Sequence, residues 1–443
     1  MTAMRPAPVD ERPAGFGPAE WRAIALATLT LIPFAAVRFY GLGAGSALAV
    51  ATAIGCAIVA AAFFLTWATE GLEVVIAAPV ALAILALVEV APEYTFEILL
   101  AYRQQTALAA ASMTGANRLL LGLGWPLILF VAYLSARRRG QRVTEIRLDA
   151  RHSVTVAYLF AASTYAFVIV LKRSLSLLDS AVLVAIYGLY IYSGLRTRKL
   201  EADEAELEAN EVGVGTAIKA LSPGRRGLAI AAFLAAGAFV LFFGAEPFID
   251  SLLETARRVG VSEFVLIQWV APFLSEFPES LTAFLWAATV VQAALGLGNL
   301  MSSKLNQWTL LIAAIPLAYS VGVGHTAALP LAAQSVDEIF LTAAQALFGT
   351  VVLLTLRFRL RDALLLLGLF LVQFAIPVEG VHVAIGWVYI GLAAIYAVAY
   401  RREIRAADVL GNLRTVHLVR RLRGARAGPD VAGGASGGAS GDA

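Results

Sequence analysis

Two proline-glutamate pairs lie in strongly apolar segments, one in each half of the chain. The first segment, ALVEVAPEYTFEILLAY, contains Pro92 and Glu93, and the second, WVAPFLSEFPESLTAFLW, contains Pro278 and Glu279. A proline inside a helix removes a backbone hydrogen bond and frees a carbonyl oxygen, which a membrane tolerates only against protein or a wet cavity. Each segment is therefore expected to place a helix break beside a carboxylate and so to offer a cation two kinds of oxygen.

Further carboxylates flank both pairs, with Glu89 and Glu97 in the first segment and Glu276 in the second. One carboxylate at the centre of a membrane helix costs about 2.5 to 3.5 kcal/mol, and packing alone rarely repays several such costs. Carboxylates held close together also retain protons more readily than isolated ones. We interpret Glu89 and Glu276 as auxiliary ligands or proton carriers, and Glu97 either as part of the site or as a vestibule residue.

A small, polar stretch follows each pair: AAASMTGANRLLLGLG in the first half and LGLGNLMSSKLNQW in the second. Arg118 and Lys304 lie at the same distance, 25 residues, after the two glutamates of the pairs. A shift of one residue instead aligns Asn117 with Lys304 and Ser112 with Asn299. In both alignments the halves repeat, and Arg118 and Lys304 are expected to act as internal counter-charges.

The composition excludes a soluble globular protein. Of 443 residues, 60% are hydrophobic and only 15% are charged, against roughly 25% charged residues in soluble domains. Apolar runs long enough to cross a bilayer must be helices there, because lipid cannot pair with backbone amides. Twelve such spans are expected near 21–40, 46–67, 74–101, 106–135, 153–171, 177–195, 227–249, 262–288, 292–321, 338–356, 362–377 and 380–400.

The two proline-glutamate segments fall in the third and eighth spans, which therefore cross the membrane in opposite directions. The sequence predicts an all-α polytopic membrane protein of about twelve transmembrane helices, with two inverted repeats around an ion site at the midplane. Secondary transporters commonly have this architecture.

Most of the 34 basic residues fall in alternate connections and in the C-terminal tail. Cytoplasmic loops retain positive charge, so we expect both termini in the cytoplasm of a multi-pass protein in the cell inner membrane. The expected organisation is a cytoplasmic N-terminal segment (1–20), a first transmembrane half (21–195, repeat about 84–126), an acidic and basic loop (196–226), a second half (227–400, repeat about 270–316) and a basic, then disordered tail (401–443).

The motif APE ending at Glu93 and the motif SEFPE ending at Glu279, each followed by a small polar helix, resemble the two alpha repeats of the sodium/calcium exchanger, or cation/calcium antiporter, superfamily. The resemblance covers the second to eleventh spans and implies that Glu93 and Glu279 are the central metal ligands. It further implies neutral ligands at Asn117, Asn299, Ser275, Ser112, Ser302 and Ser303. The implied function is secondary active cation antiport, without a cofactor.

The sequence departs from the family pattern at the second repeat, where Lys304 and Gln307 stand in place of the usual amide or acidic residue. An ammonium group near a cation site can take the place of a coupling ion, because it satisfies the same oxygens with a tethered charge. We therefore expect calcium/proton exchange by alternating access. Calcium binds six to eight oxygens, which carboxylates, amides and freed carbonyls supply.

Other function classes remain as alternatives. Sodium/calcium or sodium/proton antiport uses the same residues, and a cation channel also lines its pore with carboxylates. The apolar spans contain neither the HExxH nor the GxSxG pattern of hydrolases. The basic residues form no stripe for nucleic acid, so the expected partners are inorganic cations (calcium, proton or sodium) and the lipid bilayer. Glu338 is interpreted as interfacial, and His325 and His382 as having no metal role.

Overall fold

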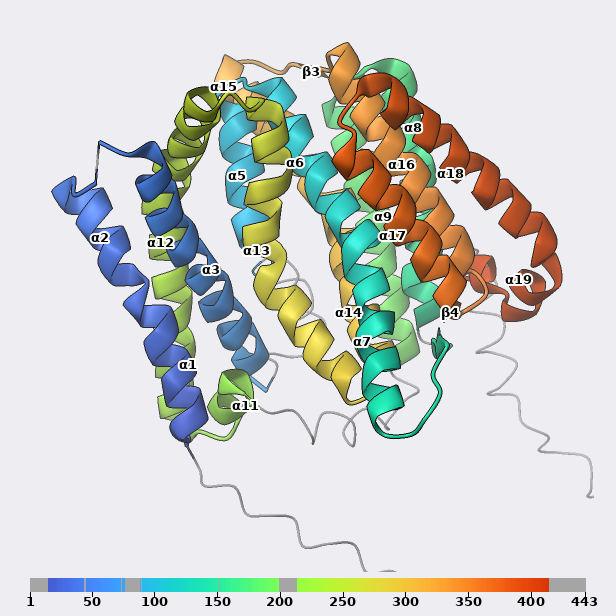
Figure 1. Ribbon diagram of the computed structural model, residues 1–443, viewed down its shortest axis with the longest axis horizontal. Coiled ribbons are helices and arrows are strands. Elements are labelled where there is room, and N and C mark those ends of the chain that lie inside the picture. The colour runs from blue at the N-terminus through green and yellow to red at the C-terminus, as the bar shows by residue number, and fades with distance from the viewer. Residues whose placement is uncertain are drawn as a thin grey trace, which may run out of the picture.

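The computed structural model describes residues 15–43, 45–72, 74–75, 88, 90–150, 152–198 and 213–413. Within this part of the chain, the fold is a bundle of helices with two short strand pairs at opposite ends (Figure 1). Eight helical stretches among these residues are long and apolar enough to cross a membrane. They are Pro18–Tyr40, Ala47–Leu72, Thr106–Arg138, His152–Lys172, Leu177–Gly194, Pro223–Val259, Ala333–Leu353 and Glu379–Ala399.

The first half has eight α-helices, one π-helical turn (η1) and two strands among its described residues. In chain order they are α1 (Pro18–Leu29), α2 (Leu31–Tyr40), α3 (Ala47–Leu72), α5 (Ala91–Tyr102), α6 (Thr106–Leu119), η1 (Leu120–Gly124), α7 (Trp125–Arg138), β1 (Glu145–Arg147), α8 (His152–Lys172), β2 (Ser174–Leu175) and α9 (Leu177–Arg198).

The second half begins after the central loop and contains a matching π-helical turn, η2. Its elements are α11 (Val214–Lys219), α12 (Pro223–Val259), α13 (Glu263–Ala288), α14 (Ala293–Asn306), η2 (Gln307–Leu311), α15 (Ile312–Val323), β3 (Leu329–Pro330), α16 (Ala333–Leu353), β4 (Arg357–Arg359), α17 (Leu360–Ala375), α18 (Glu379–Ala399), α19 (Arg401–Ala407) and η3 (Val409–Leu413).

Each of the twelve expected apolar spans overlaps a helix, but several boundaries differ. The first span is divided at Thr30 into α1 and α2. The third is represented by α5, which begins only at Ala91, and Glu89 lies outside the described residues. α13 is not among the eight apolar stretches, since it carries Glu263, Glu276 and Glu279.

Two antiparallel strand pairs join the halves. β1 pairs with β4, with Ile146 opposite Phe358, and β2 pairs with β3, with Leu175 opposite Leu329. Each pair therefore ties a loop of the first half to a loop of the second. β1 and β4 lie at the lower end of the bundle in Figure 1 and β3 at the upper end.

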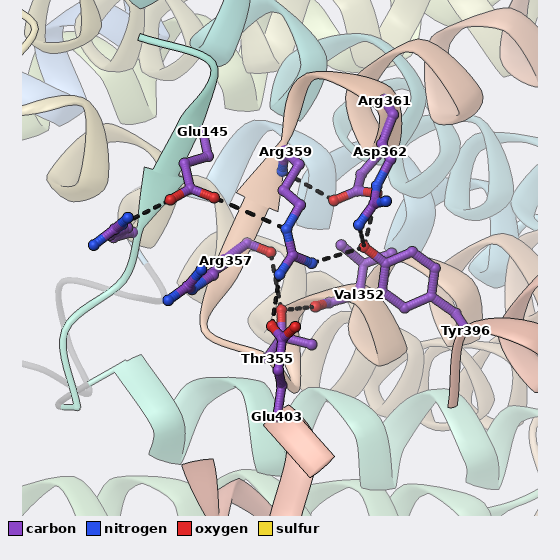
Figure 2. A network of polar contacts seen from close by, with 10 residues as sticks. Glu145, Val352, Thr355, Arg357, Arg359, Arg361, Asp362, Tyr396 and Glu403 are labelled. Atoms are coloured by element: carbon purple, nitrogen blue, oxygen red, sulfur yellow. Dashed lines mark hydrogen bonds and ion pairs between the residues drawn. The ribbon is translucent and has the colours of Figure 1, made fainter. Parts of the chain in front are cut away.

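The β1–β4 pair is surrounded by a polar network that includes α19 (Figure 2). Arg359 lies between Glu145 of β1, at 3.8 Å, and Glu403 of α19, at 2.6 Å. The Tyr396 hydroxyl accepts a hydrogen bond from Arg359 and donates one to Asp362 at 2.8 Å. This network fixes the C-terminal end of the described chain to the loops that connect the two halves.

α13 lies at the centre of the bundle and packs against α6, α14 and α3. Pro272 has no N–H, so the Gln268 carbonyl four residues earlier lacks its usual helical donor. Gly115 of α6 lies against this carbonyl, and a Cβ atom there would be 1.7 Å from the oxygen. The proline and the glycine together allow the two helices to approach closely.

Candidate ion-binding site

Glu93 lies in the first turn of α5, and its carboxylate is buried. The helix begins at Ala91, so the break expected at Pro92 is a helix start rather than a kink in a continuous helix. Proline is suited to this position because the first helical N–H groups have no intrahelical partner. The same helix end favours a negative charge, which places Glu93 where the backbone stabilises it.

Glu97 follows one turn later on α5 and is fully buried. Neither of its carboxylate oxygens has a hydrogen-bond partner among the described residues, although the Ser112 hydroxyl lies beside it. Ser275 of α13 lies beside Glu93. Both carboxylates therefore face hydroxyl groups from other helices, and no Lys or Arg side chain among the described residues forms an ion pair with either.

The second proline-glutamate pair lies in the interior of α13, which continues through Pro278. The proline leaves the Leu274 carbonyl without its helical donor. Glu279 is half-buried and accepts hydrogen bonds from Asn299 at 3.3 Å and from Ser303 at 2.8 Å. The predicted association of Glu279 with the small polar helix is thus present in the structure.

Glu276 lies one turn before Glu279 and is buried. Its Oε1 atom accepts a hydrogen bond from Gln307 of η2 at 3.1 Å. It also lies close enough to Glu93 and Glu279 to interact electrostatically with both carboxylates. Glu276 is therefore the carboxylate that connects the acidic residues of α5 with those of α13.

Lys304 is fully buried and contacts the first half directly. Its ammonium group donates a hydrogen bond to the side-chain oxygen of Asn117 and lies 3.4 Å from the Asn117 carbonyl oxygen. The ammonium also lies 4.4 Å from the ring centroid of Trp308. The Asn117 oxygen expected to face a cation is thus bound to a lysine in this conformation.

Arg118 does not neutralise the proline-glutamate carboxylates, contrary to the expectation from the sequence. Its guanidinium forms an ion pair of 2.5 Å with Glu338 of α16, and both side chains are buried. The interpretation of Glu338 as interfacial was therefore wrong. His382, for which no metal role was expected, places its Nδ1 2.7 Å from Glu338. The partner lies 220 residues further along the chain, and no local pattern indicates it.

The serines divide into two groups. Ser112, Ser275 and Ser303 are buried beside acidic residues, whereas the hydroxyl of Ser302 lies 3.4 Å from that of Tyr190 of α9. Sequence reasoning did not single out Tyr94, whose hydroxyl donates a hydrogen bond to Asn306 at 3.1 Å and so links α5 to α14. No three His, Cys, Asp or Glu side chains in the described ranges gather at metal-binding spacing.

Two hollows adjoin α13. A smaller one of about 110 Å³ reaches Glu276 between α13 and the α6–η1–α7 helix. A larger one of about 430 Å³ is open near the C-terminal end of α13, and Glu20, Glu70, Thr282 and Gln292 contribute polar groups to its lining. We call the larger hollow the vestibule. Thr282 lies on α13 three residues beyond Glu279, so the vestibule begins within one helical turn of this residue.

The comparisons with known proteins agree with this arrangement. The profile of the sodium/calcium exchanger protein family matches residues 46–195 and 229–378. A crystal structure of the H+/Ca2+ exchanger CAX is 34% identical in sequence, with a TM-score of 0.81, and the match covers 91% of this chain and 99% of that one. No curated protein sequence matches the chain.

A structure of the Ca2+/H+ antiporter YfkE has the same fold at 15% identity, with a TM-score of 0.54, and the match covers 84% of this chain and 98% of that one. The family profile covers two separate stretches, one in each half, and each contains one proline-glutamate pair with its small polar helix. The chain is a multi-pass membrane protein and belongs to the sodium/calcium exchanger family of cation antiporters.

Proposed function

We propose that the protein exchanges calcium for protons across the membrane by alternating access. The observation that carries this proposal is the set of buried carboxylates, Glu93, Glu97 and Glu276, contributed by α5 and α13. A buried carboxylate without a cation is stabilised by taking up a proton, because an unpaired buried charge is costly. Calcium and protons then compete for the same oxygens, and this competition couples their movements.

The calcium ligands in this proposal are Glu93 and Glu279, with Glu276, Glu97 and Glu89 as auxiliary ligands or proton carriers. Neutral oxygens come from Ser112, Ser275, Asn299, Ser303, Ser302 and Asn117. The contacts of Glu279 with Asn299 and Ser303 support the second-half members of this set. The Asn117 oxygen becomes available only when it separates from Lys304.

We further propose that the chain has twelve transmembrane helices in two inverted repeats, with the domain limits expected from the sequence. α6 and α14 both have 14 residues, and each is followed by a five-residue π-helical turn. Arg139, after α7, donates a hydrogen bond to the Thr289 carbonyl at the end of α13, while Gln104, after α5, donates one to the Gly322 carbonyl near the end of α15. These contacts favour opposite directions for the two repeats.

Protons rather than sodium are the proposed counter-ion. Lys304 places its tethered side-chain nitrogen on the Asn117 oxygens, which would otherwise be free for a further ion. The similarity to the H+/Ca2+ exchanger CAX, at 34% identity over 91% of the chain, agrees with this choice.

The proposed location is the inner membrane, with both termini in the cytoplasm. The β1–β4 pair brings together the arginine-rich loops after α7 and α16, so that these loops lie on one side. Positively charged loops remain cytoplasmic. The β2–β3 pair would then lie on the opposite side of the membrane.

The experiment is calcium flux into proteoliposomes under an imposed proton gradient and, separately, an imposed sodium gradient. We expect flux with the proton gradient alone. Flux driven by sodium alone would identify a sodium/calcium exchanger instead, and flux that follows membrane voltage without saturating would indicate a channel.

Glu279→Gln is expected to abolish calcium flux, because the amide cannot provide the charge that offsets calcium. Glu263→Gln is the matched control, since Glu263 lies on the same helix but at the surface, where it pairs with Arg257. The control should retain flux within about twofold of the unaltered protein. Wild-type flux in Glu279→Gln, measured at equal insertion, would remove Glu279 from the mechanism.

A further inference from the structure

Glu338 of α16 is a buried carboxylate that the proposed exchange does not use, and it is only 4% exposed. Its Oε2 atom lies 2.5 Å from the Arg118 guanidinium and accepts a hydrogen bond from Gln268 at 3.0 Å. Its Oε1 atom lies 2.7 Å from Nδ1 of His382. Both oxygens are therefore bound by donors from three other helices, α6, α13 and α18, and this environment holds Glu338 in its ionised form.

His382 lies between two hydrogen-bond acceptors and is 3% exposed. Nδ1 faces the Glu338 carboxylate, and Nε2 lies 3.0 Å from the backbone carbonyl oxygen of Gln373. A carbonyl oxygen only accepts hydrogen bonds, and so does an ionised carboxylate. A neutral imidazole carries one N–H and can satisfy only one of these contacts, whereas the imidazolium form satisfies both.

The charges around His382 permit this state. The polar groups that contact Glu338 or His382 are Arg118 on α6, the neutral Gln268 on α13 and the Gln373 carbonyl on α17. Tyr389 of α18 lies near Arg118. Glu338 is the only buried carboxylate in this set, and it lies between the guanidinium and the imidazole.

The Arg118–Glu338–His382 network contacts α6, the helix that carries the proposed ion ligand Asn117. Arg118 directly follows Asn117 on α6. Its backbone oxygen lies 3.5 Å from the amide nitrogen of Gln345 on α16. Its guanidinium lies 5.1 Å from the ring centroid of Trp269 on α13. α18 begins at Glu379, immediately after the last residue matched by the family profile. His382 therefore connects a helix outside the matched region to the site helix.

We propose that Glu338 and a doubly protonated His382 are positioning residues, which together with Arg118 hold α6 in place for ion exchange. The proton on His382 is structural and is not the one transported. Loss of this proton breaks one of the two imidazole contacts and loosens α18 from α16 or from α17. Glu338, which holds Arg118 of α6, is then less firmly positioned. The functional part of this inference rests on the proposed exchange, but the protonation of His382 does not.

The direct test is ¹⁵N NMR of the full-length protein with labelled histidine, in lipid nanodiscs at pH 7.5. The four histidines are His152, His325, His382 and His417. Replacing each of the other three by Gln in separate variants assigns the His382 signals without altering that residue. We expect two protonated ring nitrogens for His382, with the signals of the exposed His325 as the reference. One protonated and one bare nitrogen at His382 would overturn the proposal.

The functional test is calcium/calcium exchange at saturating calcium and equal pH on both sides, which requires no net proton transport. We expect exchange to fall at alkaline pH in the unaltered protein. His382→Gln should reduce it at least about tenfold at pH 7, and His382→Lys, which keeps a positive charge, should restore it at least in part and remove the alkaline fall. His325→Gln is the matched control and should leave the pH profile unchanged.

These outcomes separate the two proposals. If His382→Gln retains the exchange rate and pH profile of the unaltered protein, the positioning role is wrong, whatever ion drives transport. If calcium/calcium exchange behaves as expected but a proton gradient drives no net calcium flux, the proposed counter-ion is wrong and the role of His382 stands.

Discussion

Lys304 is the residue that most affects which ions the proposed site can hold. It is the buried ammonium group that bridges the two halves, and it takes the Asn117 oxygen as its partner rather than a carboxylate. α6 starts at Thr106 and α14 at Ala293, so equal positions along the two helices align Asn117 with Lys304. The residues in contact are therefore equivalent positions of the two repeats, one neutral and one charged.

Lys304→Asn is expected to make calcium transport respond to sodium, because the substitution removes a fixed positive charge near Glu276 and frees the Asn117 oxygen. The apparent calcium affinity should also rise by about tenfold, a change of about 1.4 kcal/mol. The measurement is calcium flux under separate sodium and proton gradients, with Lys304→Arg as the charge-preserving control. Unchanged affinity together with unchanged ion coupling would contradict a role for the ammonium group in selectivity.

At the scale of secondary structure, α6 and α13 position the residues of the proposed site by packing closely against each other. Gly115→Ala should disrupt the crossing of α6 and α13, because the new Cβ atom would be 1.7 Å from the Gln268 carbonyl oxygen and neither backbone can yield cheaply. We expect destabilisation of about 1 to 3 kcal/mol and a marked loss of exchange. Thermal unfolding in detergent measures the first effect.

Gly188→Ala provides the matched control for that substitution. Gly188 also lies within a helix, α9, but a Cβ atom there meets nothing within 4 Å. Alanine should be neutral or stabilising by up to about 1 kcal/mol, as in other helices. Equal effects of the two substitutions would show that the Gly115 contact has no special importance.

The ion pair of Glu145 in the β1–β4 strand pair makes the stability of the fold depend on pH. A hydrogen bond from Arg147 lowers the pKa of Glu145 below its ordinary value of 4.5. A carboxyl group with a lowered pKa stabilises the fold above its ordinary pKa, and this contribution is lost as the pH falls through the lowered value. Glu145→Gln should therefore lower the melting temperature slightly at pH 6 to 8.

The same substitution should have no effect once the pH is well below 4.5, where the carboxyl group is protonated in folded and unfolded chains alike. The effect is small because Arg147 is exposed and solvent screens the ion pair. Melting temperatures across this pH range test the prediction. A deficit that persists unchanged at low pH would indicate that the lost contact is not ionic.

Helices and acidic residues could be predicted from the sequence to different extents. Apolar length located the helices, since lipid enforces backbone pairing within each span. The resemblance to the exchanger family assigned Asn299 and Ser303 to one site with Glu279, and both donate hydrogen bonds to it in the structure. The Arg118–Glu338–His382 network could not be predicted, because its members lie on helices distant in sequence. Glu338 follows Asp337 at the polar start of its span, a pattern typical of an interfacial residue. The π-helical turns were also missed, since they leave no periodic signal in so apolar a stretch.

On the scale of the whole molecule, the vestibule and the arginine-rich loops lie on the same side. The vestibule is lined by Thr282 and Thr289 at the end of α13, and Arg139 binds the Thr289 carbonyl from the end of α7. If these loops are cytoplasmic, the vestibule opens toward the cytoplasm in the conformation described here, while Glu93 is buried. Alternating access then requires a second conformation that opens the opposite side.

Accessibility of single cysteines tests this orientation. In a background in which the one native cysteine is replaced (Cys56→Ser), Thr282→Cys in the vestibule should react with a membrane-impermeant thiol reagent in inside-out vesicles and only slowly in right-side-out vesicles. Ala328→Cys, in the exposed loop before β3, should show the reverse preference. Saturating calcium should slow the reaction at Thr282→Cys but not at Ala328→Cys, because only Thr282 lies within one helical turn of the proposed ligand Glu279. If Thr282→Cys reacts only in right-side-out vesicles, the proposed orientation is inverted. If both cysteines react equally in intact right-side-out vesicles, there is no closed barrier between the two sides of the membrane.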